Sequence, residues 1–359
     1  MKTEVKYIGL DIAKNVYQLF MADDRGNRIT NKKLSRKMFW EYMPNVKPCT
    51  IGIEACGGAH DCARRLMEMG HTVKMIKPER VKSFLGHRNK TDAADAQAIC
   101  EALMYPGTTF VAVKTEAQQS MDFLFDRRDR LIHDRTEVVN QTRGILAELG
   151  ITIPQGLQHF EPCFREQTAE HWDKFDARTQ RILTKNFSDY LELCEKIDAE
   201  NKEIEASAKE SAECQRLMEV SGIGPLIAVA LCAAIGNGLQ FKNGRHLASY
   251  FGLVPGEYSS GGKQHLLGIT KRGNQRIRTL LILAANAFMT GLSRRKKGED
   301  GQPLRALNPL ELWVKSLTER IGKFKAKVAL ANKMARIAWV IIAKGERFNA
   351  AKATCHAAA

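Results

Sequence analysis

The chain has 359 residues, too many for one ordinary core, and its 44% hydrophobic and 26% charged residues exclude a disordered protein. Its 55 Lys and Arg outnumber its 40 Asp and Glu, so the formal net charge of +15 disfavours basic partners and favours polyanions, first of all nucleic acid. No apolar run has the roughly 20 residues of a membrane span, and the N-terminus lacks a signal peptide's apolar run. The nine cysteines include no CxxC pair. We therefore expect a cytoplasmic protein with reduced cysteines, no zinc site and no membrane partner. A merely solvated basic surface is the alternative explanation of the charge.

The first part of the chain alternates extended and helical patterns. Apolar runs predict strands at Val5–Leu10 and Val16–Met21, and a third strand that begins at Ile29. Four elements continue the pattern: a helix at 37–43, a strand at 50–55, a helix at 62–69 and a strand at 71–76. A three-stranded meander followed by alternating strands and helices predicts a mixed sheet covered by helices. Residues 1–112 are therefore expected to form one α/β domain.

Two long helical patterns come next. In residues 117–149 a seven-residue repeat places apolar side chains at Leu124, Leu131, Val138 and Ile145, and residues 172–212 show near-heptad spacing. A repeat of seven over this length predicts a long helix that packs on a partner helix. We expect residues 113–213 to form an antiparallel coiled-coil hairpin, within the chain or between subunits.

Beyond Cys214, glycines separate short helical stretches. This pattern predicts a mostly helical domain at 214–350 and a tail at 351–359. Its first segment, SGIGPLIAVAL, is a tight glycine turn that enters a helix, in the manner of a helix-hairpin-helix. Backbone amides at Gly222 and Gly224 would then meet a DNA phosphate without reading bases. A plain connector between helices explains the same glycines equally well.

Four acidic residues stand where metal ligands are expected. Asp11 ends an apolar strand, Glu54 nearly ends another, and Asp92 and Asp95 share one face of a predicted helix. Hard cations such as Mg²⁺ take oxygen ligands, and a pair of them clamps the attacking and leaving oxygens of a phosphodiester. The four acids together predict metal-dependent phosphodiester chemistry. For the two aspartates alone, a place in the first turn of a helix capped by Thr91 is the simpler explanation.

The segment GEYSSGGKQHLLGITKRGNQRIR combines two serines with basic residues. A serine attacks a phosphodiester when it is exposed, when a base takes its proton, and when cations neutralise the phosphate. The loop supplies exposure and cations but no evident base, so a flexible turn is the commoner explanation of Ser259 and Ser260. The basic residues expected to contact nucleic acid are Arg88, Lys90, Lys271, Arg272, Arg276 and Arg278.

The chain resembles the transposases of the insertion-sequence 110 family in the ordered motifs YIGLDIAK, IGIEACGG, RNKTDAADA, VSGIGPLIA, FGLVPGEYSSGG and KRGNQRIR. The resemblance spans nearly the whole chain. It implies a ribonuclease H-like N-terminal domain, similar to the RuvC Holliday-junction resolvase, with an Asp-Glu-Asp-Asp tetrad that binds Mg²⁺. The tetrad falls on Asp11, Glu54, Asp92 and Asp95.

The resemblance also implies a C-terminal transposase domain with a catalytic serine. The family's Tyr-x-Ser-Gly pattern selects Ser260 over Ser259. Family members are also similar to RNA-guided recombinases, so donor DNA, target DNA and a structured guide RNA are expected partners. Exchange between two duplexes needs several active sites, which predicts a dimer or tetramer. Two alternatives remain: a junction-resolving nuclease that uses water as nucleophile, and a non-catalytic nucleic-acid-binding protein.

Overall fold

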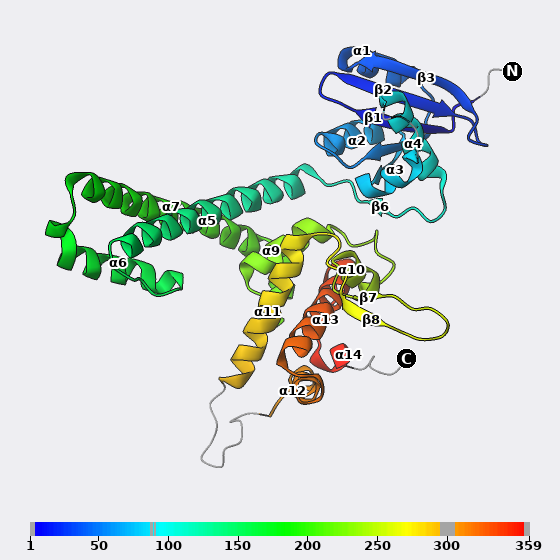
Figure 1. The fold of residues 1–359 in the computed structure, drawn as a ribbon. Helices are drawn as coiled ribbons and strands as arrows, with labels where there is room; N and C mark the ends of the chain where they lie inside the picture. The colour runs from blue at the N-terminus through cyan, green and yellow to red at the C-terminus, as the bar shows by residue number, and fades with distance from the viewer. Residues whose placement is uncertain (1–3, 87–88, 90, 295–305, 355–359) are drawn as a thin grey trace. The chain divides into compact units, whose positions relative to one another are not determined.

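The computed structural model describes residues 4–86, 89, 91–294 and 306–354, and the chain forms two compact units, Met1–Glu116 and Ala117–Ala359 (Figure 1). The first unit ends close to the expected boundary at residue 112. The second contains both the long helices and the segment after residue 213, for which the sequence pattern predicts separate domains. None of the helices in the described ranges is long and apolar enough to cross a membrane.

A six-stranded mixed sheet with the order β3-β2-β1-β4-β5-β6 forms the centre of the first unit. β1 pairs antiparallel with β2 and parallel with β4, while β5 continues the parallel part and β6 closes the edge in antiparallel orientation. The strands are β1 (Tyr7–Ile12), β2 (Val16–Ala22), β3 (Arg28–Ser35), β4 (Thr50–Glu54), β5 (Thr72–Ile76) and β6 (Phe110–Val111). This mixed α/β region fits the expected ribonuclease H-like arrangement. The sequence did not predict β6, because two residues give no periodic pattern.

Helices pack on both faces of this sheet. On one face, Leu10 and Ile53 are buried with Phe39 of α1 and Leu66 of α2. On the other face α4 lies directly on β1: a Cβ at Gly9 would lie 2.0 Å from the carbonyl oxygen of Ala96, so only glycine permits this approach. The helical elements are α1 (Arg36–Tyr42), η1 (Met43–Asn45), α2 (Ala59–Glu68), α3 (Pro78–Leu85) and α4 (Asp92–Met104).

Two long helices, α5 (Glu116–Glu148) and α7 (Ala177–Glu210), run antiparallel and are joined through α6 (Leu157–His171) and η2 (Trp172–Lys174). Arg128 Nε donates to Asn201 Oδ1 at 2.7 Å, and Asn186 Nδ2 donates to Thr142 Oγ1 at 3.2 Å. Residue numbers fall along α7 as they rise along α5, which establishes the antiparallel direction. That the pair forms a regular coiled coil stays a prediction.

The predicted heptad row on α5 is only partly buried. Leu124 is buried, whereas Leu131, Val138 and Ile145 are half-buried. The neighbouring row carries the buried side chains instead, with Val139 and Leu146 in a core shared with α6 and α7. Because α5 packs on α6 as well as on α7, its buried face differs from the face predicted for a pair of two helices.

The rest of the second unit is mostly helical, as predicted, around one large hydrophobic core. Phe125 of α5 and Ile204 of α7 belong to this core, so the base of the helical pair is not separate from the helices beyond residue 213. One hairpin, β7 (Pro255–Glu257) with β8 (Leu266–Ile269), replaces the expected flexible loop (Figure 1). The helices are α8 (Ala212–Met218), α9 (Pro225–Ile235), α10 (Gly244–Tyr250), α11 (Gln275–Ser293), α12 (Pro309–Ile321), α13 (Lys323–Lys344) and α14 (Ala350–Thr354).

Candidate functional site

Asp11 and Glu54 occupy neighbouring positions on the sheet. Leu10 pairs in parallel register with Ile53, so the next residue of β1 stands beside the next residue of β4. Strand side chains alternate between faces, and Gly9 of β1 faces α4, so Asp11 faces α4 as well. Both acids are half-buried. The structure thus brings together two of the four predicted ligands, at the ends of two buried strands.

A thiol missed by the sequence reasoning lies near this pair. Partial desolvation raises the pKa of the Cys56 thiol, and the carboxylates of Glu54 and Asp11 raise it further. Both carboxylates are therefore close enough to one sulfur to act on its charge. The sequence signal for this thiol was its position two residues after Glu54, an acid at the end of a strand. That position alone did not distinguish Cys56 from the other eight cysteines.

Asp92 and Asp95 lie in the first turn of α4. The hydroxyl of Thr91 accepts from the Ala94 amide at 3.2 Å, which confirms the expected helix cap. Asp92 is exposed and forms an ion pair with Lys33 of β3, with Nζ 2.9 Å from Oδ2. Hydrogen bonding and charge from Lys33 hold the pKa of Asp92 below its usual range. Asp95 is half-buried.

The ion pair ties α4 to the same row of the sheet that carries Asp11 and Glu54. Lys33 pairs with Gln18 across β3 and β2, and Gln18 pairs with Asp11 across β2 and β1. Register partners point to one face of a sheet. We call Lys33, Gln18, Asp11 and Glu54 the cross-strand row. The first turn of α4 therefore lies against one end of this row, with Asp92 held there by Lys33.

The donor chemistry of the tetrad suits Mg²⁺, since all four side chains are carboxylates. Among the residues that the structure describes, however, no group of three or more His, Cys, Asp or Glu side chains is close enough to hold a metal ion. Asp11 and Glu54 fit such a site as adjacent carboxylates, whereas Asp92 is engaged by Lys33. That contact is made by Oδ2 of Asp92. Arg88 and Lys90, which are predicted to contact nucleic acid, lie outside the described residues.

Ser260 stands at the tip of the hairpin of residues 255–269, which we call the serine hairpin. The Lys263 amide donates to the Ser260 carbonyl oxygen at 3.1 Å and closes a turn around Gly261 and Gly262. Their φ angles are 56° and 76°, the left-handed values that a two-residue hairpin turn requires and that glycine adopts without strain. Ser260 is exposed, as predicted, because this turn projects it from the strand end.

The structure adds a carboxylate that sequence reasoning did not find. The Ser259 hydroxyl donates to Glu257 Oε1 at 2.6 Å and accepts from the His265 amide at 3.3 Å. Residues two apart lie on one side of a strand, so this contact results from the hairpin. The sequence predicted a flexible loop here, so the alternation of side chains along a strand could not be used to place Glu257 beside Ser259. The carboxylate that could act as a base thus contacts Ser259, the serine that the family motif does not select.

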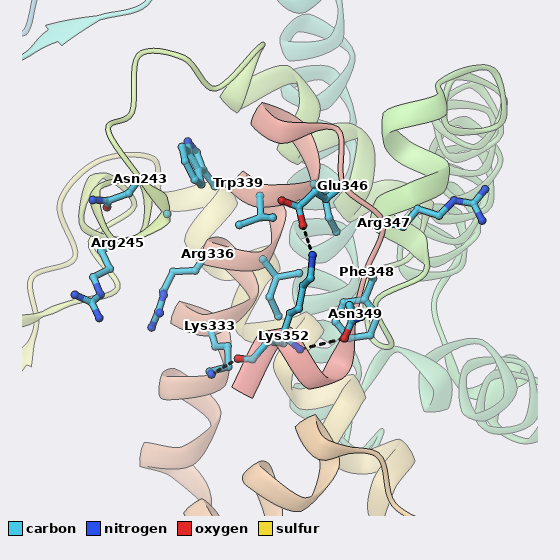
Figure 2. A pocket seen from close by; sticks show the side chains of 15 residues that line it. Asn243, Arg245, Lys333, Arg336, Trp339, Glu346, Arg347, Phe348, Asn349 and Lys352 are labelled. Atoms are coloured by element: carbon cyan, nitrogen blue, oxygen red, sulfur yellow. Dashed lines mark hydrogen bonds and ion pairs between the residues drawn. The ribbon is translucent and has the colours of Figure 1, made fainter. Parts of the chain in front are cut away.

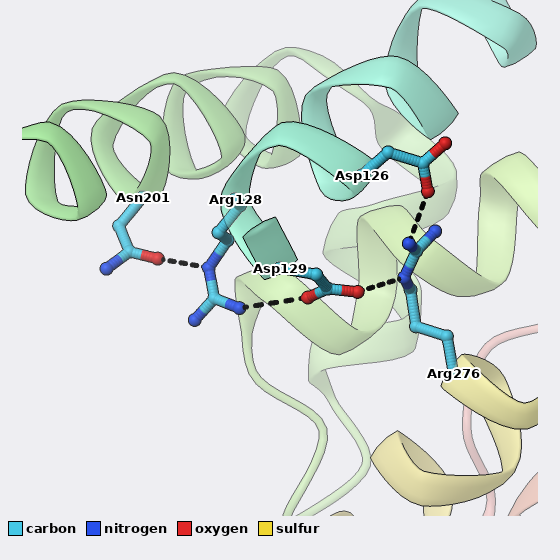
Figure 3. Close-up of polar contacts among 5 residues, drawn as sticks. All are labelled: Asp126, Arg128, Asp129, Asn201 and Arg276. Atoms are coloured by element: carbon cyan, nitrogen blue, oxygen red, sulfur yellow. Dashed lines mark hydrogen bonds and ion pairs between the residues drawn. The ribbon is translucent and has the colours of Figure 1, made fainter. Parts of the chain in front are cut away.

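Arg276 of α11 contacts α5, from which Arg128 continues the polar contacts to α7 (Figure 3). It forms ion pairs with Asp126 and Asp129 of α5, at 2.5 and 2.6 Å. Asp129 lies 3.8 Å from Arg128, whose Nε donates to Asn201 of α7. The guanidinium predicted to contact nucleic acid thus already has two carboxylate partners, and these contacts explain its presence without a nucleic acid.

Arg278 is buried, and its Nη1 donates to the carbonyl oxygens of Phe251 and Arg272 at 3.1 and 2.9 Å. These bonds hold the turn before α11, so this arginine has a structural explanation too. Lys271 and Arg272 themselves are exposed. Their contact with nucleic acid stays a prediction.

The two glycines of the turn before α9 also differ in what explains them. A Cβ at Gly222 would lie 2.4 Å from the carbonyl oxygen of Ala284, so this glycine permits close packing on α11. Gly224 is the N-cap of α9 and has open space where a Cβ would stand. The connector explanation accounts for Gly222, while a phosphate contact at Gly224 stays a prediction.

Comparisons with known proteins agree over both units. A family model for the IS110-type DEDD transposases matches residues 8–151, and a second, described as the transposase IS116/IS110/IS902 family, matches residues 214–297. The transposase for insertion sequence element IS1328 of Yersinia enterocolitica is 35% identical over 345 residues, 96% of this chain and 99% of that protein. The transposase for IS1111A of Coxiella burnetii is 36% identical over 345 residues, 96% of this chain and 92% of its own length. A pilin gene-inverting protein of Moraxella bovis is 23% identical, with 96% and 97% covered. The chain therefore belongs to the IS110 family of transposases.

Proposed function

We propose that this transposase recombines the DNA of a mobile insertion sequence with Asp11, Glu54, Asp92 and Asp95 as Mg²⁺ ligands and Ser260 as nucleophile. The observation that carries the metal half is the adjacency of Asp11 and Glu54 in the cross-strand row, on the face where α4 begins. The serine half is supported by the exposed position of Ser260 at a glycine turn. Relatives named as transposases and as a gene-inverting protein are consistent with DNA rearrangement.

The chemistry divides between the two units. When bound, Mg²⁺ would supply positive charge that stabilises the reacting phosphate oxygens. Ser260 Oγ forms a bond to phosphorus, one deoxyribose oxygen leaves and takes a proton, and the hydroxyl proton of the serine passes to a base. A hydroxyl of the exchanged strand then attacks the phosphorus of the phosphoserine ester and gives its proton to a base. The new P–O bond rejoins the DNA, the Ser260 Oγ–P bond breaks, and Oγ takes back a proton.

Ser259 is the competing nucleophile because of one observation, its 2.6 Å hydrogen bond to Glu257. A carboxylate at this distance can take the hydroxyl proton as general base. In this alternative Glu257 is the base and Ser260 only closes the turn. The water-using nuclease needs neither serine, since the same acids activate water directly.

The partners are inferred from the excess of positive charge and from the family. Donor and target DNA are proposed as substrates, and an element-encoded RNA as the guide that reads sequence by base pairing. Two duplexes must be cut and exchanged, so a dimer or tetramer is proposed, with the α5–α7 pair as its candidate assembly surface. Exposed Lys271 and Arg272 are proposed contacts to the phosphate backbone.

Strand exchange between donor and target DNA tests this function. The purified chain with Mg²⁺ and the transcribed element end should join the two DNAs, and Asp11→Asn should abolish joining while DNA binding persists. Glu68→Gln, which removes an exposed acid at the end of α2, is the matched control. Joining by Asp11→Asn at the wild-type rate would refute a role for the acid and favour a non-catalytic nucleic-acid-binding protein.

A further inference from the structure

A cavity of about 400 Å³ lies in the second unit, away from the serine hairpin residues, between α10, α13 and the segment before and within α14 (Figure 2). Its wall includes the apolar side chains of Ile337, Ile341 and Phe348, with Trp339 on one side. The charged residues that line it are Arg245, Lys333, Arg336, Glu346, Arg347 and Lys352. Its volume is in the range that binds small organic ligands of nucleotide size.

Two of the five cations have a carboxylate partner. Lys352 forms an ion pair with Glu346 at 3.2 Å, and Arg347 lies 3.8 Å from Glu219. Within the described ranges, the remaining three have no carboxylate within ion-pair distance: Arg245, Lys333 and Arg336. Lys333 is buried, and its Nζ lies 4.5 Å from the centroid of the Trp313 ring. The cavity therefore combines an apolar wall with two arginines, Arg245 and Arg336, that have no carboxylate partner among the described residues.

The fold holds these cations close together. A Cβ at Gly244 would lie 2.9 Å from the Cα of Arg336, so α10 abuts α13 and places Arg245 next to Arg336. Burial lowers the pKa of Arg336, and the charge of Arg245 lowers it further. Burial and Arg336 likewise lower the pKa of Lys333, whose Nζ donates to the Ala353 carbonyl oxygen at 2.5 Å. Like charges in a partly desolvated site repel, and a bound anion offsets that repulsion.

We propose that this cavity binds one unpaired nucleotide of a single-stranded nucleic acid, with its base on the apolar wall and its phosphate on Arg245 and Arg336. Guanidinium groups donate paired hydrogen bonds to phosphate oxygens. A base reaches an apolar wall only when it has left the duplex stack, which selects single strands over duplexes. The site rests on the proposed function only in taking nucleic acid as the partner. A displaced DNA strand and an RNA loop present the same chemistry.

Binding of labelled single strands by the full chain tests the site. Arg245→Gln/Arg336→Gln should weaken binding at least about tenfold and reduce the slope of log affinity against log salt by about 0.7, for the one phosphate that both arginines contact. Lys315→Gln/Arg320→Gln, on exposed positions of α12, removes the same charge and should bind like the wild type. Parallel RNA and DNA strands identify which of them the cavity prefers.

Filling the cavity provides a variant without charge change. Val340→Trp should weaken single-strand binding and leave duplex binding unchanged. Wild-type chain crosslinked to strands that carry 5-iodouracil needs no variant to fold, and the crosslink should map to Trp339 or Phe348. Crosslinks found only elsewhere, or an arginine double variant that binds single strands like its control, would overturn the site.

Neither assay requires DNA cleavage. A wild-type chain that crosslinks at this cavity but exchanges no strands would refute the recombinase and keep the site. A chain that exchanges strands without a crosslink here would keep the recombinase and refute the site. The two proposals therefore fail separately.

Discussion

The two halves of the proposed active site differ in how the fold supports them. The cross-strand row continues strands whose neighbouring residues Leu10 and Ile53 are 1% and 0% exposed. The serine hairpin is a separate two-stranded sheet, with Tyr258, Leu266 and Leu267 exposed to 74%, 60% and 61%. Two-stranded hairpins are marginally stable by themselves. The difference teaches that packing of the six-stranded sheet positions Asp11 and Glu54, whereas the position of Ser260 rests on a small hairpin whose large apolar side chains are exposed.

The largest expected effect comes from changing a carboxylate of the cross-strand row. Glu54→Gln keeps the size of the side chain but removes a charge next to Asp11, so DNA cleavage should fall at least about 100-fold. Strand cleavage at saturating Mg²⁺ measures this, with Glu68→Gln as the matched control. DNA binding should persist in both variants. Cleavage within about twofold of wild type would exclude Glu54 from the active site.

The next largest effect is expected in the serine hairpin. Gly261→Val/Gly262→Val forces β-branched residues into left-handed backbone angles, at a cost of about 1–3 kcal/mol each. The turn that presents Ser260 should open, and strand exchange should fall about tenfold or more, while the melting temperature changes little because the turn residues are outside the core. Gly291→Val, at an open position in α11, is the control for glycine replacement. A large drop in melting temperature for the turn variant alone would contradict this independence of hairpin and core.

A smaller effect tests whether Asp92 joins Asp11 and Glu54. Lys33→Gln removes the ion pair and one positive charge, so the Mg²⁺ concentration for half-maximal cleavage should fall about two- to fivefold. Lys37→Gln, in an exposed position of α1, is the control. A higher Mg²⁺ requirement in Lys33→Gln would show that the lysine assists the site instead of competing with the metal.

The smallest effect concerns acid stability of the first unit. His71 is buried, accepts from the Cys49 amide, and has a pKa that burial lowers below its ordinary value of 6.5. The unfolded chain binds this proton more tightly than the folded one, so the free energy of unfolding should decrease as pH falls below about 6.5. Denaturant melts from pH 7.5 to 5.5 should show this loss, of up to about 1.4 kcal/mol per unit of pKa shift, for the first unit. In His71→Gln the loss should be reduced. An equal pH dependence in wild type and variant would refute the assignment.

Apolar runs and turn residues predicted the five longer strands, near-heptad spacing predicted the helical pair, and glycines between short helical stretches predicted the C-terminal segment. They could not show that Asp11 stands beside Glu54, because strand register depends on pairing between distant segments. Basic residues were the least predictable. From the sequence, Arg276 and Arg278 resemble phosphate contacts. In the fold Arg276 pairs with Asp126, and Arg278 donates to the carbonyl oxygen of Phe251.

The serine hairpin shows the same limit at short range. Two adjacent serines before two glycines predict a turn, and the turn is there. Which serine has a carboxylate neighbour depends on strand alternation within the hairpin, and Glu257 lies with Ser259. Motif resemblance and local geometry therefore favour different hydroxyls, and only the chemistry decides between them.

Mapping a covalent protein–DNA adduct tests the central proposal most directly. A nicked donor that loses its leaving strand should trap the phosphoserine ester, and peptide mass spectrometry identifies the residue. We predict DNA on Ser260, no adduct in Ser260→Ala, and an adduct retained in Ser259→Ala. An adduct on Ser259, or cleavage by wild type with no covalent adduct, would contradict Ser260 as the nucleophile.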